Sequence, residues 1–295
     1  MSLTLPLDRA NVFGRERLSQ LFEGELPDGS PSSDVVGSWY QDVVEEMVAI
    51  IHAQWMRENT PGAVQGFFLS GPPGVGKTTL AKRVTHGLLR KGDEVGDDTD
   101  VHLGIIDGSE IARAKYGESE LRVRDIFVGA QAEMENSGSR IVLLFDDVDA
   151  VLMARGSEHA KEWHFSQDSV FFHLVDDLDT SRVMLFLTTN RPDLVDDAVR
   201  DRFLQYHVDY PEPEVLRAAA LQLARVRELS ERAEQRLVSS LDALASSSRL
   251  RSFRDARRLV LQQEIAEILG KPSKAVFLDG ESPGMSGVTD GVDGE

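Results

Sequence analysis

The feature that most constrains the fold is an apolar run that ends in carboxylates, "RIVLLFDDVDA". Ile141 to Phe145 are all apolar and are followed by Asp146, Asp147 and, one residue later, Asp149. No polar residue alternates with the apolar ones, which is the pattern of a strand buried on both faces of its sheet. Three carboxylates at the end of such a strand repel one another unless a cation, a water network or solvent accommodates them. The chain must therefore cover both faces of a sheet and use a cluster of acidic groups at its edge.

Strand and helix patterns alternate along the middle of the chain, and this alternation is typical of a parallel sheet with helices on both faces. The predicted fold class is therefore α/β. Strands are predicted at 66–70, 101–107, 141–145, 183–189 and 206–210, and helices at 39–57, 77–92, 119–134 and 168–179.

Only helical patterns remain after "PEPE" (211–214), at 215–229, 231–244 and 253–269. They predict a small all-helical second domain that follows the sheet. The C-terminal end is acidic and rich in glycine and serine, which predicts disorder. The predicted organisation is an N-terminal extension (1–33), a large α/β domain (34–211), a helical lid (212–271) and a disordered acidic tail (272–295).

Charge and composition exclude several classes of function. The chain has 32 basic and 50 acidic residues, a net charge of -18, and this acidic balance disfavours nucleic acid as the main partner. It contains no cysteine, so disulfides and thiolate metal sites are excluded and the cytoplasm is the expected compartment. No apolar run approaches the ~18 residues that a membrane span needs, so no membrane association is expected.

The segment "GPPGVGKTT" lies between a predicted strand and a predicted helix and matches the phosphate-binding pattern G-x-x-x-x-G-K-[ST]. Its glycines let backbone N–H groups converge on phosphate oxygens, and the helix N-terminus favours negative charge. Lys77 is expected to reach the β- and γ-phosphates. The predicted nucleotide-binding residues are Gly71, Pro72, Pro73, Gly74, Val75, Gly76, Lys77, Thr78 and Thr79.

A phosphate loop of this kind works with Mg²⁺, and the ion needs oxygen ligands from two places. The Thr78 hydroxyl supplies one, and Asp146 at the end of the most apolar strand is the best candidate for the other. The predicted cofactors are therefore ATP and Mg²⁺.

Taken together, these segments resemble the AAA ATPases from about Val36 to Leu269. "GPPGVGKTTLAK" is similar to the family's Walker A segment and "IVLLFDDVDAV" to its Walker B segment. "AKYGESELRVRDIF" resembles its pore-loop region, "FLTTNRPDLVDDAVRDRF" its second region of homology, and "SFRDARRLV" its sensor-2 helix. The resemblance implies a P-loop NTPase sheet sandwiched by helices, followed by a helical lid. It also implies an ATPase that acts as a ring of identical subunits, expected to be a hexamer.

The resemblance also implies roles for single residues. Asn190 stands at the sensor-1 position and Arg254 at the sensor-2 position, where both would contact the nucleotide or the attacking water. Arg200 and Arg202 stand where the family places arginines that reach the neighbouring subunit's γ-phosphate, and Arg202 is the better candidate. Such an arginine is worth ~10³–10⁵ in rate in other P-loop enzymes.

Two departures from the family pattern matter. Asp147 occupies the position where the family has a glutamate that polarises the attacking water, and its reach is shorter by more than ~1 Å. Slow hydrolysis is expected, and a nucleotide-clamped scaffold without turnover remains open. In the pore segment, Tyr116 is followed directly by Gly117, one residue earlier than the family pattern. Tyr116, Gly117 and, more weakly, Lys115 are the predicted substrate-gripping residues.

The leading prediction of function is an ATP-driven remodeller of a protein substrate that is reached directly or through an adaptor. HORMA-domain remodellers, the Rubisco-activase type and unfoldases partnered with a protease all fit, and the compact architecture favours the HORMA branch. A nucleic-acid-associated AAA loader is the second hypothesis, and the acidic balance disfavours it. The non-hydrolysing scaffold is the third.

Overall fold

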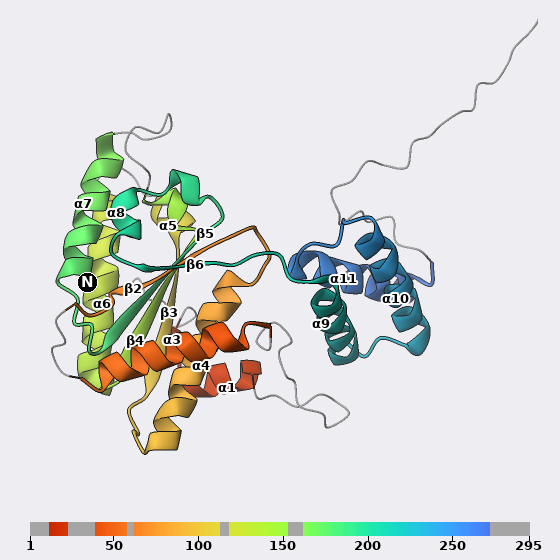
Figure 1. Cartoon of the computed structure of the whole chain (residues 1–295), viewed down its shortest axis with the longest axis horizontal. Coiled ribbons are helices and arrows are strands. Elements are labelled where there is room, and N and C mark those ends of the chain that lie inside the picture. The colour runs from red at the N-terminus through yellow and green to blue at the C-terminus, as the bar shows by residue number, and fades with distance from the viewer. Residues whose placement is uncertain (1–11, 23–38, 58–61, 113–117, 153–161, 272–295) are drawn as a thin grey trace, which may run out of the picture.

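A computed structural model describes residues 12–22, 39–57, 62–112, 118–152 and 162–271 of the chain. It contains a sheet covered by helices and a separate group of three helices, arranged as Figure 1 shows. None of the helices in these ranges is both long enough and apolar enough to cross a membrane.

The sheet has six strands in the order β1-β3-β4-β5-β2-β6. The five strands from β2 to β6 run parallel to one another, which confirms the parallel sheet that the sequence predicts. The edge strand β1, which the sequence did not predict, pairs with β3 in the antiparallel sense. The strands are β1 (Val12–Phe13), β2 (Gly66–Ser70), β3 (Val101–Asp107), β4 (Arg140–Asp146), β5 (Val183–Thr189) and β6 (Leu204–His207).

Helices cover both faces of this sheet. One hydrophobic cluster joins the sheet to α1 (Arg15–Phe22), α3 (Gln41–Trp55) and α4 (Lys77–Val95). The other joins it to α6 (Glu118–Ser137) and α7 (Glu162–Asp176). Short helices α5 (Gly108–Ala112), η2 (Val148–Ala150), η3 (Pro192–Leu194) and α8 (Asp197–Arg200) follow the ends of strands.

Strand β4 is buried on both faces of the sheet, which confirms the prediction made from its apolar run. Val142 and Leu144 face the first cluster, whereas Ile141, Leu143 and Phe145 face the second. All five side chains are buried. The carboxylates that follow are thereby held at the C-terminal edge of the parallel strands, where α/β sheets bind ligands.

Residues 12–22 are part of the large domain, although the sequence placed them in an extension before it. Phe13 and Leu18 are buried in the first cluster, since β1 adds a strand to the sheet edge and α1 packs beside α4. Arg15 Nη1 lies 2.8 Å from Asp93 Oδ2 of α4. The short β1 carries no strand pattern of its own, because two residues are too few to show alternation.

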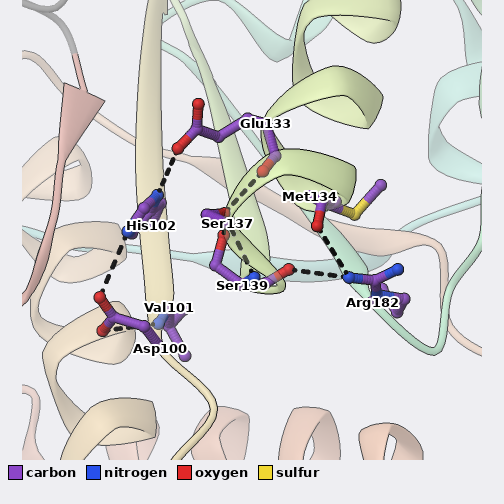
Figure 2. A network of polar contacts seen from close by, with 8 residues as sticks. All are labelled: Asp100, Val101, His102, Glu133, Met134, Ser137, Ser139 and Arg182. Carbon is purple, nitrogen blue, oxygen red and sulfur yellow. Dashed lines mark hydrogen bonds and ion pairs between the residues drawn. The ribbon is translucent and has the colours of Figure 1, made fainter.

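A polar network links several elements near the N-terminal ends of the parallel strands, at the other end of the sheet from Asp146 and Asp147 (Figure 2). His102 of β3 lies between Asp100, at 3.3 Å from Nε2, and Glu133 of α6, at 3.1 Å from Nδ1. Arg182, just before β5, donates to the carbonyls of Met134 and Ser139 at 3.2 and 3.4 Å. These contacts fix the amino ends of β3, β4 and β5 relative to α6 and leave the other edge of the sheet for binding.

The three remaining helices form the predicted lid around their own core. They are α9 (Pro213–Val226), α10 (Glu231–Ser246) and α11 (Phe253–Leu269). A capping box starts α11, in which the Ser252 side chain accepts from the Asp255 N–H and the Asp255 side chain accepts from the Ser252 N–H. The lid touches the large domain at this point, because Phe253 N–H donates to the Gly74 carbonyl at 3.0 Å.

Candidate nucleotide site

The loop between β2 and α4 has the conformation that its glycines allow. Gly71, Gly74 and Gly76 all have positive φ, at 147°, 79° and 100°. A Cβ on Gly71 would lie 2.1 Å from the Val208 carbonyl oxygen, and one on Gly74 would lie 2.9 Å from Arg254 Cβ. Larger residues would therefore strain the backbone and also clash. The loop delivers its chain to the N-terminus of α4, where backbone N–H groups are free to bind an anion.

Lys77 is buried at the start of α4, and its ammonium group is held by neutral oxygens. It donates to the carbonyls of Gly71 and Pro72, both at 2.9 Å, and to Asn190 Oδ1 at 2.6 Å. Burial lowers the pKa of the Lys77 ammonium, and the nearby Asp147 and Asp146 carboxylates oppose that shift. A phosphate would exchange these neutral partners for charged ones, which form stronger hydrogen bonds.

Thr78 and Asp146 lie side by side, as expected for a shared Mg²⁺ site. Thr78 Oγ1 is 3.0 and 2.9 Å from the two carboxylate oxygens of Asp146, and the Thr188 hydroxyl also donates to Asp146. Hydroxyl and carboxylate oxygens are ligands that Mg²⁺ accepts. Within the described ranges no three acidic or histidine side chains converge to hold a metal alone. The donor set therefore fits an ion whose other ligands are phosphate oxygens and water.

Asp147, the candidate water-polarising residue, is joined to Lys77 through one amide. Asn190 Nδ2 donates to Asp147 Oδ1 at 2.9 Å, while Asn190 Oδ1 accepts from Lys77. The amide thus links the group that would hold the phosphates to the group that would activate water. A movement of Lys77 toward a phosphate would therefore change the hydrogen bonds of Asn190, including the one that it donates to Asp147.

The backbone at Asp147 is left-handed, with φ 54° and ψ 52°. Aspartate tolerates this region better than longer side chains do. Gly108 makes room for it, because a Cβ there would lie 2.6 Å from the Asp147 carbonyl oxygen. Burial raises the pKa of Asp147, and the neighbouring charges of Asp146 and Asp149 raise it further. A raised pKa makes the carboxylate a better proton acceptor than an exposed aspartate.

These groups surround a cavity of about 420 Å³ between the sheet edge and the lid. A hollow of about 760 Å³ lies on the lid between α10 and α11 and shares no residue with the phosphate loop. The smaller cavity is the candidate site, because the phosphate loop and the Asp146, Asp147 and Asn190 side chains converge on it. The cavity is lined by Gly74, Gly76, Lys77, Thr78, Thr79, Asp146, Asp147, Asn190, Phe253, Arg254 and Arg257.

Two of the residues that bear on this cavity carry no assignment from the sequence. Arg257 lies three residues after Arg254 on α11, so both project from one side of that helix. This spacing is the sequence feature from which a role for Arg257 beside Arg254 could have been predicted. Tyr40, at the start of α3, donates from its hydroxyl to the Val75 carbonyl and so braces the phosphate loop from behind. Burial raises the pKa of the Tyr40 hydroxyl, which keeps it a donor. Nothing in the local sequence around Tyr40 signals this contact.

Arg200 and Arg202 do not line the cavity of their own chain. Arg202 makes two hydrogen bonds to Asp176 of α7, Nε–Oδ1 at 3.0 Å and Nη2–Oδ2 at 3.2 Å. Its guanidinium also lies 4.8 Å from the centre of the Phe172 ring. Arg200 donates to the Pro192 carbonyl. Both roles therefore stay predictions that depend on a second subunit.

The three predicted pore residues, Lys115, Tyr116 and Gly117, lie outside the described residues. The elements on either side of them are described. Helix α5 ends at Ala112 and helix α6 begins at Glu118. Their role also stays a prediction.

Comparison with known proteins identifies the domain that carries the site. Residues 67–209 match the family model described as ATPase family associated with various cellular activities (AAA). The match begins within β2 and ends just after β6, so it includes the phosphate loop, the Asp146 carboxylate and Asn190.

Curated relatives share this region. The chain is 28% identical over 210 residues to a proteasome-associated ATPase of Kineococcus radiotolerans, covering 66% of this chain and 36% of that protein. It is 30% identical over 210 residues to an AAA ATPase forming ring-shaped complexes of Corynebacterium efficiens, covering 66% of this chain and 38% of that protein. The chain thus spans little more than a third of the length of these relatives.

Solved structures share the fold. A chain in the Escherichia coli MS115-1 HORMA:CdnC:Trip13 complex superposes with a TM-score of 0.53 and 17% identity, covering 76% of this chain and 88% of that one. Caenorhabditis elegans PCH-2 superposes with a TM-score of 0.57 and 19% identity, covering 77% of this chain and 61% of that one. At these identities the likeness concerns the arrangement of sheet and lid.

Proposed function

Because this chain belongs to the AAA family of ATPases, we propose that it binds ATP with Mg²⁺ and couples hydrolysis to the remodelling of a protein substrate. The observation that carries the proposal is the convergence of Lys77, Thr78, Asp146, Asp147 and Asn190 on one cavity. It supplies one cation for phosphate, one pair of oxygens for a metal and one carboxylate for a water molecule.

The residues divide the work as follows. Lys77 leaves the Gly71 and Pro72 carbonyls and neutralises the β- and γ-phosphates. Thr78 and Asp146 would hold Mg²⁺, which when bound would supply positive charge beside the same phosphates. Asp147 accepts a proton from the attacking water, with Asn190 fixing its orientation through the 2.9 Å hydrogen bond.

The lid also contributes residues to the cavity. Arg254 and Arg257 of α11 line it, and the Phe253 N–H is hydrogen-bonded to the Gly74 carbonyl of the phosphate loop. Loss of the γ-phosphate removes negative charge that these arginines would bind. The lid would then shift relative to the sheet, which is how hydrolysis becomes movement.

We propose a hexameric ring in which Arg202 reaches the γ-phosphate of the neighbouring subunit. The Corynebacterium efficiens relative is named for its ring-shaped complexes, and Arg202 does not line the cavity of its own chain. Assembly would have to release Arg202 from Asp176. An exposed ion pair of this kind is worth only about 0–1 kcal/mol, so a phosphate competes with it easily.

The proposed substrate is a polypeptide gripped by Tyr116, with Lys115 and Gly117 beside it. HORMA-domain proteins are the first substrate class to test, because the fold resembles that of a chain solved in a complex with a HORMA protein. The net charge of -18 disfavours the alternative of a nucleic-acid loader.

A second function, nucleotide-dependent scaffolding without turnover, is favoured by one observation. Asp147 is one methylene shorter than the glutamate that the family has at this position, so its reach is shorter by more than ~1 Å. A misplacement of ~1 Å can reduce the rate by ~10². The same site would then bind ATP and hold one conformation.

Phosphate release from ATP by the purified chain separates the two functions. An enzyme releases phosphate in a Mg²⁺-dependent manner, and Asp147→Asn abolishes the release while nucleotide still binds. A scaffold binds nucleotide equally well and releases none. The Asp147→Asn chain loaded with ATP should then retain a HORMA-domain protein that the Lys77→Ala chain does not retain.

A further inference from the structure

The last helix of the lid presents an apolar stripe on the side that faces away from the lid core. The core side of α11 carries Ala256, Leu259 and Val260, all buried. The opposite side carries an outer stripe of Leu261, Ile265, Ile268 and Leu269, none of which belongs to the lid core. Ile268 is 77% exposed and Leu269 is 53% exposed. Ile265 lies nine residues, or two and a half turns, after Ala256, which places it opposite the core.

The end of α11 turns the chain so that it can return along this stripe. Gly270 adopts a left-handed conformation with φ 62°, and its N–H donates to the Glu267 carbonyl at 3.1 Å. Pro272 follows two residues later and cannot continue the helix. A left-handed glycine followed by proline is a helix stop that redirects the backbone.

The sequence after α11 has an apolar segment followed by acidic residues, and α11, read from its C-terminal end, has the apolar stripe followed by a basic residue. Residues 275–278, "AVFL", are apolar, and the acidic residues Asp279 and Glu281 come directly after them. Read backwards along α11, the apolar outer stripe ends at Leu261 and is followed by Arg258, three residues earlier on the same side. An extended segment running antiparallel to α11 would set apolar residues against the stripe and Asp279 near Arg258.

Distances along the chain permit this arrangement. Three residues, 272–274, separate Lys271 from Ala275 and are available for a turn that would set Ala275 beside Leu269. From Ala275 onward each extended residue would advance about 3.3 Å, so Phe277 would lie about 6.6 Å back along the helix, close to the ~6 Å of rise between Leu269 and Ile265. A segment tethered this closely has an effective concentration in the millimolar range, which favours it over a separate partner.

We propose that residues 275–278 of this chain dock in cis on the outer stripe of α11, with Asp279 facing Arg258. The occupant lies outside the described residues and is identified by its sequence and its tether. The docked segment would lead toward Arg254, four residues before Arg258, and so toward the nucleotide cavity. Disorder would then be confined to the more distal part of the predicted tail.

Disulfide trapping tests this directly because the chain has no cysteine of its own. The test chain carries Ile265→Cys with Phe277→Cys, and the matched control carries Glu267→Cys with Phe277→Cys. Glu267 is exposed and close in sequence, but it lines the hollow on another side of α11. Under mild oxidation we expect an intramolecular disulfide in the test chain to form at least about tenfold faster than in the control.

Three results would overturn the proposal. Equal rates in the two chains would mean that the segment does not dock. A disulfide between two molecules would assign the stripe to a second copy. Unchanged trapping after Asp279→Lys at low salt would remove the Arg258 contact. Amide exchange in the cysteine-free chain gives an independent check, since 276–278 should be protected and should lose protection in Ile268→Asp. These readouts need no ATP hydrolysis, so they stand apart from the proposed function.

Discussion

Replacing Asp147 by asparagine should abolish most hydrolysis while leaving the site intact. Asparagine keeps an acceptor for Asn190, which now donates to Asp147 at 2.9 Å, and it tolerates the left-handed backbone at φ 54°. What is lost is the ability to accept a proton and the negative charge. General-base catalysis is worth ~10²–10⁴ in rate, and a short carboxylate belongs at the lower end of that range. We expect a decrease of ~10²–10³, or about 2.7–4 kcal/mol in the activation free energy.

The assay is single-turnover phosphate release with Mg²⁺-ATP, with nucleotide affinity measured on the same sample. Asp149→Asn is the matched control, because Asp149 accepts from the Thr189 hydroxyl at 2.5 Å and does not line the cavity. The control should stay within a few-fold of the parent. Equal losses in the two variants, or unchanged turnover in Asp147→Asn, would refute the assignment of the base.

The pH profile gives a second signature of the same residue. Burial, followed by the charges of Asp146 and Asp149, raises the pKa of Asp147 above that of an ordinary aspartate. The base works only when ionised, so kcat/KM should fall as the pH drops through this raised pKa. The acid limb should therefore lie above the ~3.9 of an unperturbed aspartate, and it should disappear in Asp147→Asn.

Three further predictions concern residues around the site. Arg202→Ala should keep nucleotide binding but lose hydrolysis, and mixing it with Lys77→Ala should restore activity; failure to complement while subunits exchange would exclude a role in trans. Tyr116→Ala should keep basal hydrolysis and lose substrate remodelling, and remodelling at the parental rate would exclude threading by this loop. Tyr40→Phe leaves the Val75 carbonyl without its donor, so the KM for ATP should rise up to ~10-fold with kcat unchanged; an unchanged KM would show that the hydroxyl does not brace the loop.

Much of the fold could be predicted from period and composition. The bounds of four elements match those that the sequence predicts, because each apolar pattern ends next to a glycine or a polar residue. These elements are the strands 66–70, 101–107 and 183–189 and the helix 253–269. β1 and α1 could not be predicted in the same way. Phe13 and Leu18 are buried because β1 pairs with the edge strand β3 and α1 packs against the same cluster. This burial depends on tertiary packing, which the local sequence does not indicate.

Part of the candidate site could likewise be predicted from the sequence, and part could not. Thr78 and Asp146 could be paired from sequence, since a phosphate loop and a strand-end carboxylate need each other, and they lie within 3.0 Å. The left-handed backbone of Asp147 depends on Gly108, which belongs to a different strand end. Contacts of that kind arise from packing between distant segments and leave no local pattern.

Nucleotide affinity of the Lys77→Ala chain tests the central claim most directly. Lys77 is the buried cation of the cavity, and its removal leaves the β- and γ-phosphate charges without their partner. Hydrogen bonds to charged groups contribute about 1.5–3 kcal/mol, which corresponds to a ~10–100-fold loss of affinity. Calorimetric titration with Mg²⁺-ATP should therefore show binding weakened at least ~10-fold, with thermal unfolding of the nucleotide-free chain near that of the parent. An affinity within a few-fold of the parent would contradict the assignment of this loop as the phosphate site.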